Sequence, residues 1–203
     1  MKQTMTQAME QKTRIAILFS GRGSNMKSLA AHIARADVPA EFVLALCNRP
    51  DAGGIDWCHD NGIACQVIDH KQYETRAGFE ADMQAALEAA QVDLICAAGF
   101  MRLLTGDFVN HWHDRLLNIH PSLLPAYKGL HTHQRALEDG ARQHGCTVHL
   151  MRPEMDDGPI LVQKQVAVLA DDTPDSLAAR VLEQEHVAYP EALDKVLAGL
   201  HAK

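Results

Sequence analysis

The sequence predicts an α/β fold in which a mostly parallel sheet is flanked by helices. Over the first two-thirds of the chain, short apolar segments alternate with helix-like segments. This order is typical of parallel strands joined by helical crossovers. The short segments are apolar almost throughout, which indicates strands that are buried on both faces. We therefore expect a Rossmann-like domain whose ligand site lies at the carboxyl ends of the strands.

The parallel part is expected to contain five strands with helices between them. The strands are predicted at residues 14–19, 41–47, 64–68, 92–97 and 116–120. The helices are predicted at residues 24–35, 55–61, 76–90 and 105–111. Pro121 cannot donate a hydrogen bond to a neighbouring strand, so the fifth strand should end before it.

The final third of the chain has a different pattern. A helix is predicted at 132–140, followed by strands at 146–151 and 160–169. The loop between these two strands is too short for a helical crossover, so they should form an antiparallel C-terminal extension of the sheet. Thr173 and Pro174 are typical of an N-cap and a first turn, and they predict a last helix that runs to about residue 199.

Length and composition limit the domain organisation. The 203 residues suggest one domain over 13–203, with an N-terminal half to about residue 128 and a C-terminal half over 129–203. Residues 1–12 are polar and are expected to form a disordered tail. No apolar segment approaches the roughly 20 residues of a membrane helix, and the N-terminus has no secretory-signal pattern. We therefore expect no membrane partner.

Charge and cysteine usage narrow the function classes further. The formal charge of −7 argues against a broad nucleic-acid surface. The five cysteines are an odd number without a Cys-x-x-Cys pair, which predicts buried free thiols in a reducing cytoplasm. No cysteine or acid lies at zinc-like spacing from the His111/His113 or His131/His133 pairs, so we expect no metal site.

A glycine-rich turn, Ser20-Gly-Arg-Gly-Ser-Asn25, lies between the first strand and the first helix. Glycines allow a tight turn, and the free N–H groups at a helix start suit a phosphate. Met26 stands where a dinucleotide fingerprint needs a third glycine, and the chain has no Gly-Lys-Ser/Thr motif. The turn predicts a phosphate-bearing small molecule, with a plain turn capped by Ser24 or Asn25 as the alternative.

Asn118 and His120 lie two residues apart at the end of the fifth strand, so their side chains should point to the same face. An amide beside an imidazole can stabilise an oxyanion and move a proton. Asp156 or Asp157, in the loop between the late strands, could orient the imidazole and favour its charged form. The alternative is that both polar side chains only satisfy local backbone groups.

Four motifs occur together in the order and spacing of a known family. They are Ser20-Gly-Arg-Gly-Ser-Asn25, Ala98-Gly-Phe-Met-Arg-Leu-Leu104, Asn118-Ile-His-Pro-Ser-Leu-Leu-Pro125 and Asp156-Asp-Gly-Pro-Ile160. Through them the chain resembles the phosphoribosylglycinamide formyltransferases over nearly all of residues 14–200. The resemblance implies the formyltransferase fold. It also implies transfer of a formyl group from the co-substrate 10-formyltetrahydrofolate to the amine of glycinamide ribonucleotide, in purine biosynthesis.

The resemblance also implies roles for individual residues. Protonated His120 and Asn118 would stabilise the oxygen of a tetrahedral intermediate, and Asp156 would pair with His120. The ribonucleotide and its phosphate would be bound by Gly23, Ser24, Asn25 and Glu185. Folate would be bound by Arg76, Met101, Arg102, Leu103, Leu104, Asn118, Met151, Arg152, Pro153, Glu154, Met155 and Asp156. His131 and His149 could border the substrate.

Two residues depart from the family pattern. Arg22 stands where some members have a small or amide residue, and we expect it to add positive charge near the phosphate. Asp157 places a second carboxylate beside Asp156, where glycine is common, and leaves open which acid faces His120.

Three other functions are weighed against this one. A methionyl-tRNA formyltransferase usually has an added RNA-binding domain, and the negative charge disfavours tRNA. A formyltetrahydrofolate deformylase usually has an added regulatory domain, for which we expect no room in this chain. A non-catalytic module that binds a phosphate-sugar would use the glycine turn but would not need Asn118, His120 and Asp156. We expect a monomer or a homodimer.

Overall fold

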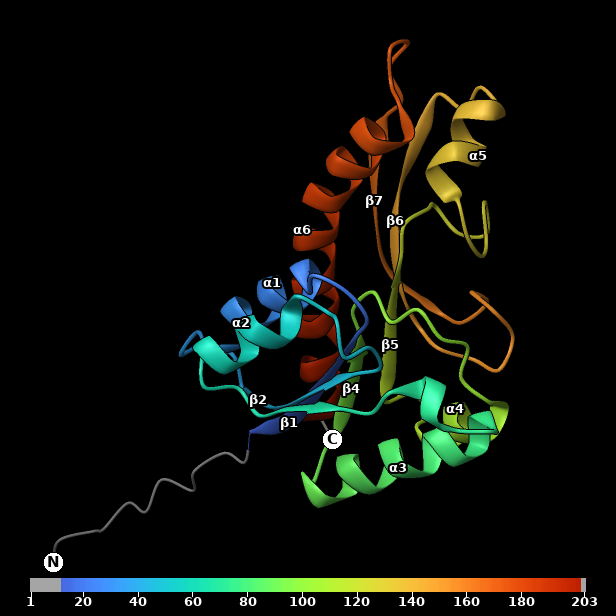
Figure 1. The fold of residues 1–203 in the computed structure, drawn as a ribbon. Helices are drawn as coiled ribbons and strands as arrows, with labels where there is room; N and C mark the ends of the chain where they lie inside the picture. Colours follow the sequence, from blue (N-terminus) through green and yellow to red (C-terminus); the bar gives the residue numbers. More distant parts are fainter. Residues whose placement is uncertain (1–11, 202–203) are drawn as a thin grey trace, which may run out of the picture.

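The computed structural model describes residues 12–201, which form one seven-stranded sheet with helices on both faces (Figure 1). The tail predicted at 1–12 lies outside the described residues, except for Lys12. The strands are β1 (Thr13–Phe19), β2 (Ala40–Cys47), β3 (Cys65–Val67), β4 (Leu94–Ala97), β5 (Leu116–His120), β6 (Gln143–Leu150) and β7 (Ile160–Ala167). The helices are α1 (Ser24–Ile33), α2 (Gly54–Asp60), η1 (His70–Gln72), α3 (Arg76–Ala89), α4 (Gly106–His111), α5 (Thr132–Glu138) and α6 (Pro174–His201).

The sheet confirms the predicted mixture of parallel and antiparallel strands. Its order is β3-β2-β1-β4-β5-β6-β7. The first five strands pair in parallel, whereas β6 is antiparallel to both β5 and β7. Since β5 is the last parallel strand, its carboxyl end lies where the antiparallel extension joins the sheet. Asn118 and His120 are therefore at the junction of the two parts.

β6 begins at Gln143, three residues before the predicted strand, and β7 ends at Ala167, two residues before the predicted end. Gln143, His144 and Gly145 pair with the last residues of β7. These three residues carry no apolar signal, so only the partner strand determines that they are extended. The short 3-10 helix η1 was also not predicted; the Asp69 carboxylate caps it by accepting the Lys71 N–H at 3.0 Å.

The core has one layer on each face of the sheet. In β1, Ile15, Ile17 and Phe19 face a layer completed by α1 and α6, while Ala16 and Leu18 face a layer completed by α3 and α4. Figure 1 shows α1 and α2 above the β1–β2 part of the sheet and α3 below it. Burial on both faces explains why β1 is apolar throughout.

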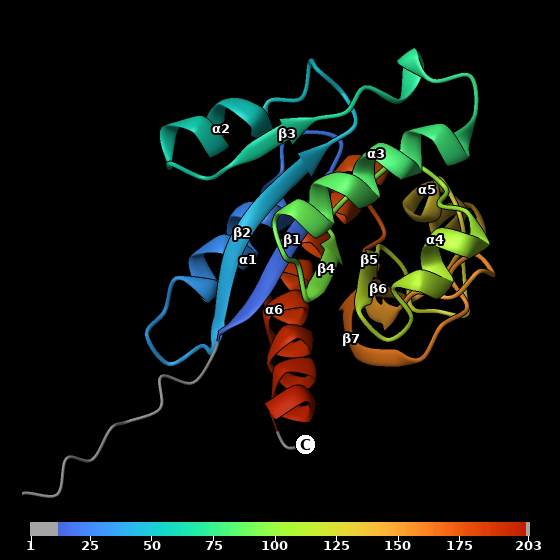
Figure 2. The ribbon, with the colours of Figure 1, turned by 90° about the horizontal axis from the view of Figure 1, so that it is seen from below.

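Helix α6 connects the two parts of the sheet. The Thr173 hydroxyl accepts the Ser176 N–H at 3.2 Å, which confirms the predicted N-cap. The helix continues through Pro190 and packs against β6, β7 and α1. The fully buried Tyr189 hydroxyl donates to two carbonyls, that of Ala97 at the end of β4 and that of Leu117 within β5. Figure 2 shows α6 beside the sheet along most of its length. None of the described helices combines the length and apolar character needed to cross a membrane.

Candidate active site

The glycine-rich turn is held by Ser20, whose buried side chain joins three segments. Its hydroxyl donates to the Asn48 amide oxygen at 2.6 Å and accepts the Met101 N–H at 2.7 Å. The Ser20 N–H donates to the Gly99 carbonyl at 3.1 Å. These contacts place the turn after β1 beside the Ala98–Leu104 motif that follows β4. Two of the four motifs are therefore adjacent in space.

Gly23 is the N-cap of α1, with a φ of 72° in the left-handed region. Within the described part of the chain, no side chain caps this helix start. The predicted cap by Ser24 or Asn25 is therefore wrong, whereas phosphate binding by this turn stays a prediction. The first N–H groups of α1 remain without a side-chain acceptor, which is the arrangement that a phosphate needs. Arg22 is exposed immediately before this turn.

Asn25 and Glu185 meet although 160 residues separate them along the chain. The Asn25 Nδ2 group donates to Glu185 Oε2 at 2.7 Å, and both side chains are buried. Burial raises the pKa of Glu185, and the hydrogen bond from Asn25 opposes that shift. The buried Asn25 Oδ1 atom has no hydrogen-bond partner among residues 12–201. The structure thus brings together two residues predicted to bind the ribonucleotide.

His120 is buried and faces an acceptor at each ring nitrogen. Nε2 lies 2.9 Å from the Tyr127 carbonyl oxygen, and Nδ1 lies 3.5 Å from Asp156 Oδ2. A carbonyl only accepts, so Nε2 must carry a hydrogen. Nδ1 faces the Asp156 carboxylate at a distance longer than that of an ordinary hydrogen bond.

Asp156, rather than Asp157, is the acid that faces His120. Asp156 Oδ2 also accepts the Gly129 N–H at 2.9 Å. The backbone of Asp156 has a φ of 52°, in the left-handed region. Asp157 instead forms an exposed ion pair with Lys128. These contacts join the loop after β5 to the loop between β6 and β7. They answer the question that two adjacent carboxylates left open in the sequence.

His149 belongs to the same cluster and is the residue whose position the sequence indicated least clearly. Its Nε2 atom lies 3.2 Å from Asn118 Nδ2 and 3.9 Å from Asp156 Oδ1. His149 lies directly opposite Asn118 in the antiparallel β5–β6 pair. The register of that pair was not available from the sequence. The Tyr127 carbonyl was missed entirely, because a main-chain group carries no residue-type signal.

The residues predicted to bind folate include unusually exposed apolar side chains. Met101 is 69% exposed, Leu103 58% and Met155 52%. Their positions near a helix start would by themselves indicate core residues for Met101, Leu103 and Leu104. The exposure excludes this for Met101 and Leu103, whereas Leu104 does pack against the core. Leu104, Met151, Arg102 and Arg152 are half-buried, whereas Pro153, Glu154 and Arg76 are exposed. Arg152 forms an ion pair with Asp114 at 2.6 Å. The contact of each residue with folate stays a prediction.

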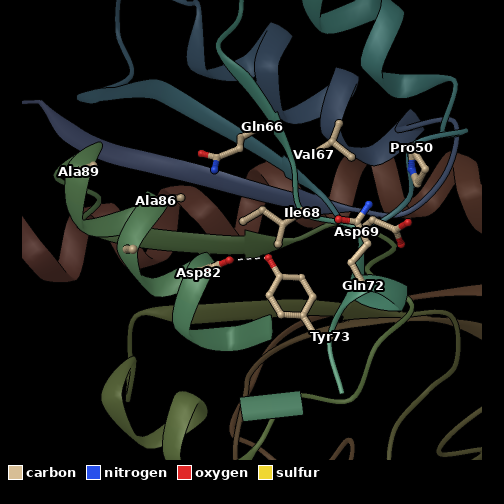
Figure 3. Close-up of a pocket in the computed structure, with 11 residues that line it drawn as sticks. Pro50, Gln66, Val67, Ile68, Asp69, Gln72, Tyr73, Asp82, Ala86 and Ala89 are labelled. Atoms are coloured by element: carbon tan, nitrogen blue, oxygen red, sulfur yellow. Dashed lines mark hydrogen bonds between the residues drawn. The ribbon is translucent and has the colours of Figure 1, made fainter. Parts of the chain in front are cut away.

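A separate cavity of about 510 Å³ lies between β3 and α3 (Figure 3). Its lining includes Ile68, Tyr73 and Asp82, and the Tyr73 hydroxyl donates to the Asp82 carboxylate. None of the predicted site residues lines this cavity. We therefore place the candidate active site at the carboxyl ends of β1, β4 and β5, where the polar chemistry converges. Within the described ranges, no three His, Cys, Asp or Glu side chains gather as a metal site.

Comparison with known proteins agrees with this geometry. The family model described as Formyl transferase matches residues 13–193. The chain belongs to the formyl transferase family. It is 39% identical over 176 residues to the phosphoribosylglycinamide formyltransferase of Escherichia coli (strain K12), covering 87% of this chain and 83% of that protein.

Other relatives of this formyl transferase are longer or of known structure. It is 44% identical to the trifunctional purine biosynthetic protein adenosine-3 of Drosophila melanogaster, covering 94% of this chain but only 14% of that protein. The chain therefore spans a small part of such trifunctional relatives. The phosphoribosylglycinamide formyltransferase structure from Brucella melitensis is 47% identical with a TM-score of 0.87, covering 92% of this chain and 96% of that one.

Proposed function

We propose that this formyl transferase moves a formyl group from 10-formyltetrahydrofolate to the amine of glycinamide ribonucleotide, a step of purine biosynthesis. The observation that carries the proposal is the convergence of Asn118, His120 and Asp156 at the end of β5. The names of the bacterial relatives and the family match support the substrates. The five cysteines are free, which is compatible with the reducing cytoplasm where we expect the enzyme to act.

The proposed reaction begins when the neutral amine of the ribonucleotide attacks the formyl carbon. A C–N bond forms, and the carbonyl electron pair moves to oxygen, so a tetrahedral oxyanion develops. An N–H group of His120 and one of Asn118 can donate to this oxygen. Donors that are already in place stabilise a transition state strongly, and losing one typically costs about 10²–10³-fold in kcat.

The intermediate then collapses. The carbonyl re-forms, the bond from the formyl carbon to the folate nitrogen breaks, and that nitrogen takes up a proton. The attacking amine must lose one proton during the same sequence. Asp156, whose side chain is only 12% exposed and lies beside His120, is placed to accept it directly or through water.

The two substrates are assigned to two neighbouring sets of residues around this group. The ribonucleotide phosphate would bind the free N–H groups at the start of α1, with Asn25 and Glu185 beside the ribose. The buried Asn25 Oδ1 atom without a partner supports a polar ligand there. The exposed apolar side chains of Met101, Leu103 and Met155 would cover the folate ring. Transfer then takes place between the two sites.

The test is product analysis with the folate donor, in the presence and absence of glycinamide ribonucleotide. We expect formylated ribonucleotide to appear only with both substrates, and His120→Ala to abolish it. Formate release that ignores the amine would instead identify a deformylase. Binding of the ribonucleotide without any turnover would identify a non-catalytic module. Retained turnover in His120→Ala would contradict the catalytic assignment.

A further inference from the structure

We infer that His149 is a positioning residue, which holds the amide of Asn118 so that one N–H group faces the reacting oxygen. The inference rests on the proposed function and deepens it. His149 itself is not required to touch either substrate. It would act as a neutral imidazole with its hydrogen on Nδ1 and its lone pair on Nε2.

The surroundings of His149 determine where its hydrogen lies. Nδ1 is 3.1 Å from the carbonyl oxygen of Leu150, which can only accept a hydrogen bond. Nδ1 must therefore carry the hydrogen. The side chain is buried, and burial lowers its pKa, which favours the neutral ring. A neutral ring with hydrogen on Nδ1 leaves a lone pair on Nε2.

That lone pair selects one orientation of the Asn118 amide. Nε2 is 3.2 Å from Asn118 Nδ2, and the two residues face each other across the β5–β6 pair. The amide nitrogen must point toward His149, because its oxygen would meet the lone pair and repel it. One N–H group of Nδ2 then donates to His149. The second N–H group remains for the oxyanion.

The neutral state of His149 also leaves the Asp156 carboxylate free to interact with His120. Asp156 Oδ1 lies 3.9 Å from His149 Nε2, and Asp156 Oδ2 lies 3.5 Å from His120 Nδ1. A charged His149 would compete for the same carboxylate and would turn its Nε2 into a donor against Asn118. A neutral His149 does neither, so Asp156 remains with His120.

Two substitutions of similar polarity separate this role from a structural one. In His149→Gln, the side-chain amide reaches the position of Nε2 and can still accept from Asn118. In His149→Asn, the shorter amide reaches the position of Nδ1 and can bond Leu150 but not Asn118. We expect His149→Gln to keep kcat within about threefold. We expect His149→Asn to lose roughly tenfold or more, with little change in either KM, because the lost interaction acts in the transition state.

A double-mutant cycle tests whether the effect passes through Asn118. In an Asn118→Ala background, adding His149→Asn should leave the residual kcat unchanged within about twofold, because there is no amide left to orient. A further loss equal to that of His149→Asn alone would overturn the inference. So would equal losses in His149→Gln and His149→Asn while both variants keep their thermal unfolding temperature.

The position of the hydrogen can be measured in the unmodified protein without any assay. In ¹⁵N NMR spectra of the imidazole nitrogens, we expect His149 to show a protonated Nδ1 and an unprotonated Nε2 at neutral pH. A hydrogen on Nε2 would overturn the inference whatever the activity. If the protein forms no formylated ribonucleotide, the proposed function fails, while this spectrum still decides the state of His149.

Discussion

At the scale of single residues, the proposed chemistry depends on how His120 is enclosed. Its two ring nitrogens face a main-chain carbonyl from the loop after β5 and a carboxylate from the loop between β6 and β7. The residue type supplies the imidazole, but these two loops supply its charge environment. A change in either loop should therefore alter turnover more than binding.

The two adjacent acids provide a direct comparison. We expect Asp156→Asn to lower kcat by about two orders of magnitude, since it removes the charge beside His120. Asp157→Asn should change kcat by less than about fivefold, because an exposed ion pair contributes little. Steady-state kinetics on both variants, with their unfolding curves as a control, checks this. A larger loss in Asp157→Asn would reverse our assignment.

Arg22 provides a test of the phosphate site. It is exposed immediately before Gly23, so removing its charge should weaken attraction to a phosphate at the start of α1. We expect Arg22→Ala to raise the KM for the ribonucleotide a few-fold and to leave the KM for folate unchanged. Arg35→Ala, beyond the far end of the same helix, is the matched control. An unchanged ribonucleotide KM in Arg22→Ala would count against the phosphate site.

At the scale of elements, the β6–β7 pair carries the loop that holds Asp156. Gly145 in β6 lies where the backbone of β7 approaches closely: a Cβ there would be 2.0 Å from the Lys164 carbonyl oxygen and 2.9 Å from a Leu123 methyl group. Neither strand can move away without breaking its pairing. The glycine therefore sets how closely the antiparallel extension packs.

We expect Gly145→Ala to lower the free energy of unfolding by more than about 3 kcal/mol, as a steric clash inside a packed sheet does. Gly199→Ala is the control, because a Cβ on that exposed helical residue meets nothing within 4 Å. It should stabilise the protein by up to about 1 kcal/mol. Urea unfolding measures both variants. Equal stability of the two would contradict the close approach of β6 and β7.

At the scale of the whole molecule, buried histidines connect stability to pH. Burial lowers the pKa of His133, His149 and His186, and it lowers that of His144 to about 4. In the unfolded chain the histidine side chains have pKa values near the ordinary 6.5. The unfolded chain therefore binds more protons than the folded chain between pH 6.5 and 4. Stability is therefore lost as the pH falls through this window.

Glu185 acts in the opposite direction, because its pKa is raised in the folded chain. The stability that it contributes is present at low pH and is lost as the pH rises through this raised pKa. It is one group against four, so the histidines should dominate. We expect the free energy of unfolding to decrease from pH 7 to pH 5, with each differential proton contributing up to about 1.4 kcal/mol per pH unit. Replacing His144 by Phe should make this dependence shallower. A free energy of unfolding that is independent of pH would contradict the prediction.

Much of the architecture was predictable from local patterns. β1 is buried on both faces and reads as an apolar run, β5 has the predicted bounds, and Thr173 caps the last helix as expected. These features depend on side chains within a few positions of one another. The ends of β6 and β7 were not predictable, because Gln143 and His144 become extended only through their partner strand.

The sequence by itself determined the fold class and the family and predicted which residues react, since apolar periodicity and motif spacing are local properties of the chain. Only the tertiary structure decided that Asp156 rather than Asp157 faces His120, that Asn25 meets Glu185, and that His149 lies beside Asn118. The last two contacts join residues 160 and 31 positions apart. Their geometry depends on strand register and helix packing, which no short segment of sequence contains.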